Sequence, residues 1–193
     1  MTDGLRVGAD GVARCWWCGD DLLYMAYHDT EWGRPVRHDH RLYEKLCLEG
    51  FQSGLSWLTI LRKRDNFRAA FAGFDPAVVA RFGEVEVERL LGDAGIVRHR
   101  GKIVSTINNA QRALELIDEF GSIGTFLDQF VPAPGPAPVG IGDIPAKTAE
   151  SAAISKELKR RGWSFVGPTT VYAFMQSMGL VNDHLAGCSL RAA

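Results

Sequence analysis

The chain has 193 residues, of which 46% are hydrophobic and 23% charged, and its formal net charge is −1. This length allows one domain, or two closely packed subdomains, with a substantial core, and no apolar stretch is long enough to span a membrane. Four cysteines without a signal peptide argue against a secreted, disulfide-linked protein. We therefore expect a cytoplasmic protein with reduced thiols and no membrane partner.

Positive charge is concentrated in three short clusters, at residues 62–64, 98–102 and 159–161. A nucleic-acid interface needs only local positive potential, so the small net charge does not exclude one. The alternative for each cluster is an ordinary solvated helix face.

The pattern along the chain is helical after an irregular start. Residues 1–14 show no period and are expected to form a flexible extension. From His40 to Phe74, apolar residues recur at helical spacing on either side of a turn at residues 53–54. Further helices with cap signals are predicted after Asp75 and at residues 84–91, 99–120, 148–161 and 168–178. No series of strands is found, so the predicted fold class is all-α.

Residues 131–147 form a Pro/Gly-rich segment in which Pro132, Pro134, Pro136 and Pro138 alternate with other residues. Such a segment can be neither a helix nor a central strand, and we expect an extended surface loop. A second irregular segment begins at Gly162 and joins the last two predicted helices. Main-chain N–H groups at the start of the second helix would suit a phosphate, although an ordinary connection between helices explains the local sequence equally well.

Cysteine and histidine residues occur near both ends of the chain. Cys15, Cys18 and His28 lie in the first thirty residues, and His184 and Cys188 lie near the C-terminus. Because these residue types supply the ligands of closed structural zinc sites, the pattern indicates a zinc ion that joins the two ends. The alternative is that the cysteines are ordinary buried core residues.

Five longer segments resemble, in the same order, the motifs of the 3-methyladenine DNA glycosylase I family: residues 21–33, 47–57, 93–103, 163–171 and 174–184. The resemblance extends from Cys15 to Cys188. It implies an all-α, helix-hairpin-helix DNA glycosylase-like fold with a zinc clip joining the N- and C-terminal segments. It also implies one glycosylase domain over residues 15–190, formed by two packed helical subdomains, and hairpin contacts to DNA from Gly162, Ser164, Val166, Gly167 and Thr169.

Aromatic residues near one carboxylate form the candidate substrate site. A 3-methylated adenine is cationic in DNA, so aromatic faces and a carboxylate would favour it over neutral adenine. The resemblance assigns base recognition to Tyr27 and Glu49 and stacking to Trp57, with Trp17 and Tyr24 as walls. Taken singly, each aromatic residue is more typical of core packing than of a binding site, and Glu49 is more typical of a solvated helix end.

The resemblance also implies the chemistry. A cationic purine is already a good leaving group, so the enzyme must mainly flip the nucleotide out of the helix and bind the base. Glu49 is the expected catalytic residue, acting electrostatically, and no residue is expected to be an indispensable general base. Asn182 aligns with the aspartate of related glycosylases, and Asp183 is the competing candidate. No lysine follows the hairpin at a position that suggests a Schiff base, so strand cleavage is not expected.

The zinc ligands implied by the resemblance are Cys15, His28, His184 and Cys188, with Cys18 as a competitor for His28. Four protein ligands make the zinc structural. Two other functions are considered: a non-enzymatic damage-sensing domain, and a zinc hydrolase, which lacks an activating glutamate at metal-ligand spacing. Leu55, or its neighbours Ser53 and Gly54, is the candidate wedge that fills the gap left by the flipped nucleotide. The expected partner is double-stranded DNA with alkylated bases, bound by a monomer.

Overall fold

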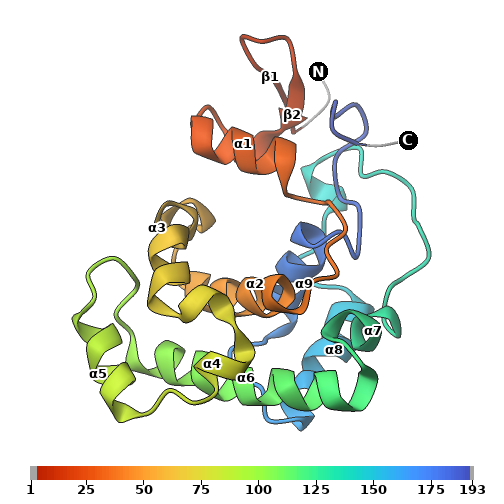
Figure 1. Cartoon of the computed structure of the whole chain (residues 1–193). Coiled ribbons are helices and arrows are strands. Elements are labelled where there is room, and N and C mark those ends of the chain that lie inside the picture. Colours follow the sequence, from red (N-terminus) through yellow and green to blue (C-terminus); the bar gives the residue numbers. More distant parts are fainter. Residues whose placement is uncertain (1–3, 192–193) are drawn as a thin grey trace.

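The computed structural model describes residues 4–191, and most of them are helical (Figure 1). The nine helices of this part of the chain are α1 (Leu22–Thr30), α2 (Asp39–Gln52), α3 (Trp57–Ala70), α4 (Pro76–Val79), α5 (Glu84–Gly92), α6 (Arg100–Phe120), α7 (Ile123–Asp128), α8 (Ala149–Arg160) and α9 (Pro168–Ser177). Short 3-10 turns occupy Trp16–Cys18, Ala72–Phe74 and Ile141–Asp143. The mainly helical prediction is confirmed, although α1 and α7 were not predicted.

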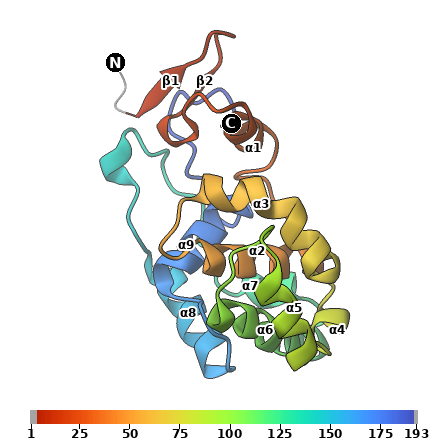
Figure 2. The same ribbon diagram turned by 90° about the vertical axis from the view of Figure 1, so that its left-hand side faces the viewer.

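Helix α2 lies at the centre of the molecule, with α3, α6, α7 and α9 packed around it (Figures 1 and 2). All ten residues from Leu42 to Phe51 are buried. Its apolar side chains join the main core, and the Tyr43 hydroxyl donates to the carbonyl of Thr106 on α6 at 2.7 Å. The same buried stretch contains Glu44, Lys45 and Glu49, so charged groups are enclosed within the core.

The N-terminal segment differs from the flexible extension that the sequence predicted. Strands β1 (Leu5–Val7) and β2 (Ala13–Cys15) pair antiparallel, with Leu5 opposite Cys15. Their three-residue length is too short for an alternating pattern to be visible in the sequence. Tertiary contacts compensate, because the main-chain N–H of Ser189 donates to the Ala13 carbonyl at 2.8 Å. The hairpin is therefore part of the junction between the two ends of the chain.

Side-chain caps explain where several helices begin and end. Asp21, Ser56 and Thr148 each accept a hydrogen bond from a main-chain N–H in the first turn of the following helix. At the end of α2, the buried ammonium of Lys102 donates to the carbonyls of Phe51 (2.8 Å) and Ser53 (2.6 Å). One member of the second basic cluster therefore supports the fold.

Ion pairs also use much of the remaining positive charge. Arg62 pairs with Asp21, Arg64 with Glu31, and Arg100 with Glu84 and Glu88. In the third cluster, Arg160 and Arg161 pair with Glu157, and Arg161 also pairs with Glu119. The clusters thus join helices to one another, and only part of their charge is available to a ligand.

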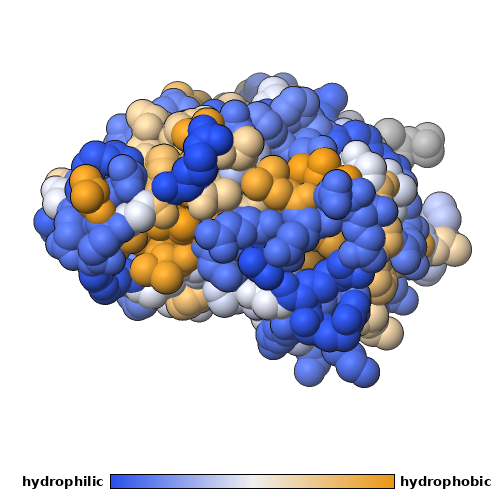
Figure 3. All heavy atoms as spheres, turned by 60° about the horizontal axis from the view of Figure 1, so that its bottom comes forward, coloured by the Kyte–Doolittle hydropathy of each residue, from blue (hydrophilic) through white to orange (hydrophobic). Residues whose placement is uncertain are grey.

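The Pro/Gly-rich segment 131–147 crosses the surface from α7 to α8 and is broken by the 3-10 turn Ile141–Asp143 (Figure 2). The carbonyl of Pro138 accepts from the main-chain N–H of Ala186 at 2.7 Å, which ties the segment to the C-terminal region. On the face seen in Figure 3, hydrophilic side chains surround several apolar patches. None of the described helices has the length and apolar character needed to cross a membrane.

The C-terminal end of α9 packs against the chain between α1 and α2. Gly179 has φ +70°, and a Cβ there would lie 2.5 Å from the Pro35 nitrogen and 2.6 Å from the Arg34 carbonyl carbon. Gly121 after α6 has φ +80° but no atom within 4 Å of an added Cβ. Both glycines have a positive φ, but only Gly179 also has neighbouring atoms too close for a side chain. Comparing substitutions at the two positions therefore separates the cost of backbone strain from the cost of a steric clash.

We expect Gly179→Ala to lower the free energy of unfolding by more than about 2 kcal/mol, because the backbone of residues 34–35 must move. Gly121→Ala, with strain alone, should cost about 1 kcal/mol. Urea unfolding of both variants measures the difference. An equal loss of unfolding free energy in the two variants would show that the clash with Arg34 and Pro35 contributes nothing beyond backbone strain.

Candidate functional site

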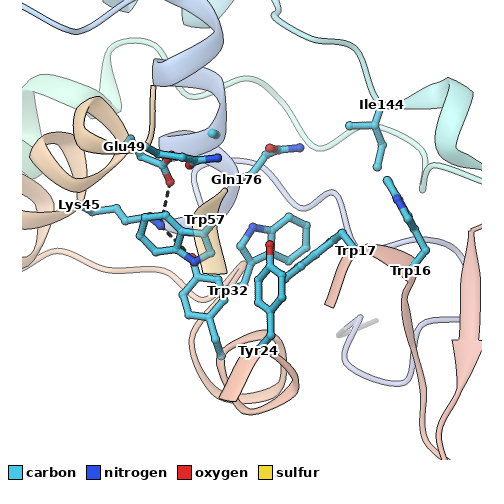
Figure 4. Close-up of a pocket in the computed structure, with 12 residues that line it drawn as sticks. Trp16, Trp17, Tyr24, Trp32, Lys45, Glu49, Trp57, Ile144 and Gln176 are labelled. Atoms are coloured by element: carbon cyan, nitrogen blue, oxygen red, sulfur yellow. Dashed lines mark hydrogen bonds and ion pairs between the residues drawn. The ribbon is translucent and has the colours of Figure 1, made fainter. Parts of the chain in front are cut away.

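A cavity of about 220 Å³ lies between α1, the central helix α2 and helix α9 (Figure 4). Its walls are mainly aromatic, and its polar side chains come from α2 and α9. The lining residues are Trp16, Trp17, Tyr24, Tyr27, Trp32, Lys45, Glu49, Gln52, Trp57, Ile144, Ala173 and Gln176. All five predicted substrate-site residues, Trp17, Tyr24, Tyr27, Glu49 and Trp57, therefore meet around one cavity.

The aromatic walls are positioned by short elements at the edge of the core. Tyr24 and Tyr27 are three residues apart on α1 and project from one face of it. The ring centroid of Trp17 lies 5.1 Å from that of Tyr24 and 5.0 Å from that of Trp32. Trp57, the first residue of α3, lies 5.5 Å from Tyr27 at an interplanar angle of 44°. These rings leave a cavity with flat walls.

The charged groups of the cavity lie one turn apart on α2. The Lys45 Nζ is 2.8 Å from a carboxylate oxygen of Glu49, and both side chains are more than nine-tenths buried. Nζ also donates to the Tyr27 hydroxyl at 2.9 Å and lies 3.1 Å from the centroid of the Trp57 ring. Figure 4 shows the lysine chain ending between Glu49 and Trp57. The cavity therefore contains its own ion pair.

Burial dominates the proton equilibria of these groups. Desolvation lowers the pKa of Lys45 to about 8, although the neighbouring Glu49 carboxylate favours the charged ammonium. Burial raises the pKa of Tyr24 to about 12 and that of Tyr27 well above its usual value. Both phenols therefore remain neutral at physiological pH, and of these three groups Lys45 loses its proton most easily.

Asp183, the competing catalytic candidate, does not line the cavity. Its carboxylate accepts hydrogen bonds from the Tyr172 hydroxyl at 2.5 Å and from the Gln176 amide at 2.9 Å. Gln176 lines the cavity, so Asp183 fixes the orientation of a cavity residue. Asn182 accepts from the main-chain N–H of His184 at 3.3 Å.

The four predicted metal ligands form one buried cluster. Cys15, His28, His184 and Cys188 each offer a ligand atom, and these four atoms all lie within 4.8 Å of one another. Cys188 Sγ is 3.4 Å from His184 Nδ1 and 3.6 Å from His28 Nε2. A tetrahedral ion with bonds of roughly 2.0–2.3 Å requires ligand separations of this size. The donor set and its spacing thus fit a closed metal site.

Neighbouring groups support this cluster. Asp29 accepts a hydrogen bond from His28 Nδ1 at 2.8 Å, which leaves Nε2 facing the cysteines, and Arg14 pairs with Asp29 at 2.7 Å. Hydrogen bonding from Cys15, and then from the imidazoles, lowers the pKa of the Cys188 thiol. Cys18 is outside the cluster, and its thiol donates to the Cys15 carbonyl at 3.2 Å.

The segment between α8 and α9 is held against α6. The carbonyl of Ser164 accepts from the Asn109 amide at 3.0 Å, and its N–H donates to Asn109 Oδ1 at 3.0 Å. The N–H of Gly162 donates to the main-chain carbonyl of Lys159, and the Val166 side chain is buried. Among the predicted DNA contacts, the N–H groups of Val166, Gly167 and Thr169 have no acceptor in the described chain.

Several cavity residues were not identified from the sequence. Lys45 had a detectable signal, because it precedes Glu49 by four residues on a predicted helix, the spacing of an ion pair. Trp32 and Gln176 lay within the quoted motifs but carried no separate signal. Ile144 comes from the Pro/Gly-rich segment, and only the tertiary fold brings it to the cavity.

The fold and the cavity define a class of helical protein in which an aromatic-walled cavity contains a buried carboxylate, that of Glu49. The family model described as methyladenine glycosylase matches residues 17–192. DNA-3-methyladenine glycosylase 1 of Escherichia coli is 50% identical over 180 residues, which cover 92% of this chain and 96% of the relative. The chain belongs to the methyladenine glycosylase family.

Solved structures agree with this assignment. A crystal structure of 3-methyladenine DNA glycosylase I matches with a TM-score of 0.89 and 48% identity, over 93% of this chain and all of that chain. A variant of 3-methyladenine DNA glycosylase I in complex with 3-methyladenine matches with a TM-score of 0.88 and 33% identity, over 92% of this chain and 96% of that chain.

Proposed function

We propose that this protein is a DNA repair glycosylase that hydrolyses the N-glycosidic bond of 3-methyladenine in alkylated double-stranded DNA and leaves an abasic site. The observation that carries the proposal is the buried Glu49 carboxylate among the rings of Tyr27 and Trp57. The names of the relatives support the same activity.

The cavity walls suit a flipped, positively charged base. Methylation at N3 gives the base in DNA a positive charge, which the faces of Trp57 and the neighbouring rings attract by roughly 0.5–2 kcal/mol each. The Glu49 carboxylate accepts charge-assisted hydrogen bonds from the base edge. Neutral adenine lacks the charge, so this difference in binding favours the damaged base.

Bond cleavage needs little proton transfer, because the cationic base leaves readily. Glu49 is the proposed catalytic residue, and its negative charge stabilises the cationic substrate as the bond to the sugar lengthens. Asp183 acts as a positioning residue through Gln176. Because no lysine follows the hairpin at a position suited to a Schiff base, the proposed reaction is hydrolysis without strand cleavage.

DNA binding is assigned to the hairpin of residues 162–168 and the start of α9, as in helix-hairpin-helix proteins. The N–H groups of Gly167 and Thr169 at this helix start suit a phosphate oxygen. Gly162, Ser164 and Val166 support the shape of the hairpin. Leu55, which is 44% exposed in the turn between α2 and α3, is the proposed wedge.

The Cys/His cluster is proposed to bind structural Zn²⁺ through Cys15, His28, His184 and Cys188. Zinc would bind both thiolates and join the first and last segments of the chain. Four protein ligands leave no position for water, which argues against a zinc hydrolase. A damage-sensing domain without activity would not need a base cavity, so the cavity lined by Tyr27, Glu49 and Trp57 argues against that alternative.

We expect Glu49→Gln to lower kcat/KM for release of 3-methyladenine from methylated DNA by about 10- to 100-fold, because one charge-assisted interaction is lost. Asp183→Asn should change it by less than about fivefold, since the amide still accepts one hydrogen bond. Chromatography of the released bases measures both. Full activity in Glu49→Gln together with none in Asp183→Asn would reverse the two roles.

We expect the purified protein to contain about one zinc ion per chain, and Cys188→Ser to contain much less, because one thiolate ligand is removed. Cys18→Ala is the matched control and should retain the metal, since its thiol lies outside the cluster. Metal analysis with thermal unfolding measures both effects. Loss of zinc in Cys18→Ala would place Cys18 among the ligands.

A further inference from the structure

Lys45 has no role in the proposed recognition of a cationic base, although it lies within the base cavity. Its ammonium has three donors and three partners: the Glu49 carboxylate at 2.8 Å, the Tyr27 hydroxyl at 2.9 Å and the Trp57 ring face at 3.1 Å. A buried cation with these partners needs no further contact. The protein's own groups therefore satisfy all three donors of the lysine.

These three partners are the groups to which base recognition is assigned. A cationic base that stacks on Trp57 and binds Glu49 would bring a second positive charge close to Nζ. With Lys45 protonated, Lys45 and Glu49 are together neutral, so this pair provides no net charge that attracts a cation. With Lys45 neutral, the cavity has one negative charge and favours a cation over an uncharged base of the same shape.

We propose that Lys45 is an internal cation that occupies the recognition groups of the cavity and determines specificity. A cationic base takes its place beside Glu49 and Trp57, and the lysine loses its proton. The N–H bond of the ammonium breaks, its electron pair remains on Nζ, and the proton passes to solvent water. The inference rests on the proposed function, since it concerns the same cavity and the same cationic base.

The surrounding charges make Lys45 the group that titrates. Glu49 on the same helix faces it, as does neutral Tyr27 from α1. The other charged groups nearby pair with one another: Glu31 after α1 with Arg64 on α3 and with Arg41, and Glu44 with Arg41 and Arg68. The residues that α9 and its C-terminal end contribute, Gln176 and Met178, are uncharged. Arg64 lowers the pKa of Lys45 and Glu31 raises it, so these two charges largely cancel and their net effect is small beside that of desolvation.

The direction of the pH dependence follows from this arrangement. Burial lowers the pKa of Lys45 to about 8 in the free protein. A bound cation lowers it further, so binding releases a proton below that pH. Affinity for a cation should therefore rise by up to about tenfold per pH unit toward pH 8 and then become constant. Affinity for a neutral base should vary much less.

The test uses two probes that differ by one methyl group and the positive charge it brings: 3,9-dimethyladeninium, which mimics the damaged nucleoside, and uncharged 9-methyladenine. Calorimetry between pH 6 and 9, in buffers of different ionisation enthalpy, gives both the affinity and the number of protons released. For the unaltered protein we expect the preference for the cation to rise by at least about tenfold between pH 6 and 8. We also expect each binding event with 3,9-dimethyladeninium to release, on average, more than half a proton at pH 7.

Two variants separate charge from structure. Lys45→Met removes the charge while keeping an unbranched chain, and it should bind the cation at least about fivefold more tightly at pH 7, with no step near pH 8. Lys45→Arg retains a charge that is not lost in this range and should bind the cation more weakly at every pH. A merely structural role for Lys45 would weaken binding in both variants.

Three results would each overturn the inference: a pH-independent affinity without proton release in the unaltered protein, weaker cation binding in Lys45→Met, or failure of the unaltered protein to bind 3,9-dimethyladeninium. Release of 3-methyladenine from methylated DNA by the unaltered protein at pH 8.5 tests the proposed function separately. Base release with a pH-independent affinity would therefore refute the role of Lys45 and leave the glycosylase assignment standing.

Discussion

The burial of charge on the central helix is the constraint on which the rest of the structure depends. Helix α2 is enclosed on all sides, yet it contains Glu44, Lys45 and Glu49. A buried charge without a partner costs several kcal/mol, so each must be matched by the elements around it. Arg68 on α3 pairs with Glu44, while Tyr27 on α1 and Trp57 on α3 contact Lys45. The packing of α1 and α3 is thus fixed by the same contacts that form the cavity.

Helix α1 connects this constraint to the ends of the chain. Tyr27 faces the cavity and the next residue, His28, faces the Cys/His cluster, so one turn of helix serves both sites. Glu31 at the end of α1 pairs with Arg64, and Asp21 at its start pairs with Arg62. The position of the cavity wall therefore depends on the cluster that joins residues 15 and 188, about 170 positions apart in sequence.

Sequence reasoning identified the features that local physics determines. Capping residues and 3.6-residue periodicity predicted α2, α3, α4, α5, α6, α8 and α9, and these predictions are confirmed. Helix α1 and the β1–β2 hairpin were not predicted because both are short and are held by distant segments, including Ser189. Likewise Lys45 and Trp32 were missed as cavity residues, since a buried lysine is unusual and a single tryptophan has no signal that separates a wall from a core. Resemblance, rather than local pattern, brought Glu49 and Trp57 together.

The contribution of Ile144 to the cavity has an evolutionary consequence. This side chain comes from the Pro/Gly-rich segment, in which most side chains are not buried and which few hydrogen bonds tie to the domain. Surface segments of this kind accept substitutions and length changes far more readily than helices in a core. A change of sequence at the entrance to the cavity therefore need not disturb the buried helix α2 that carries Lys45 and Glu49, so that access and recognition are free to evolve at different rates.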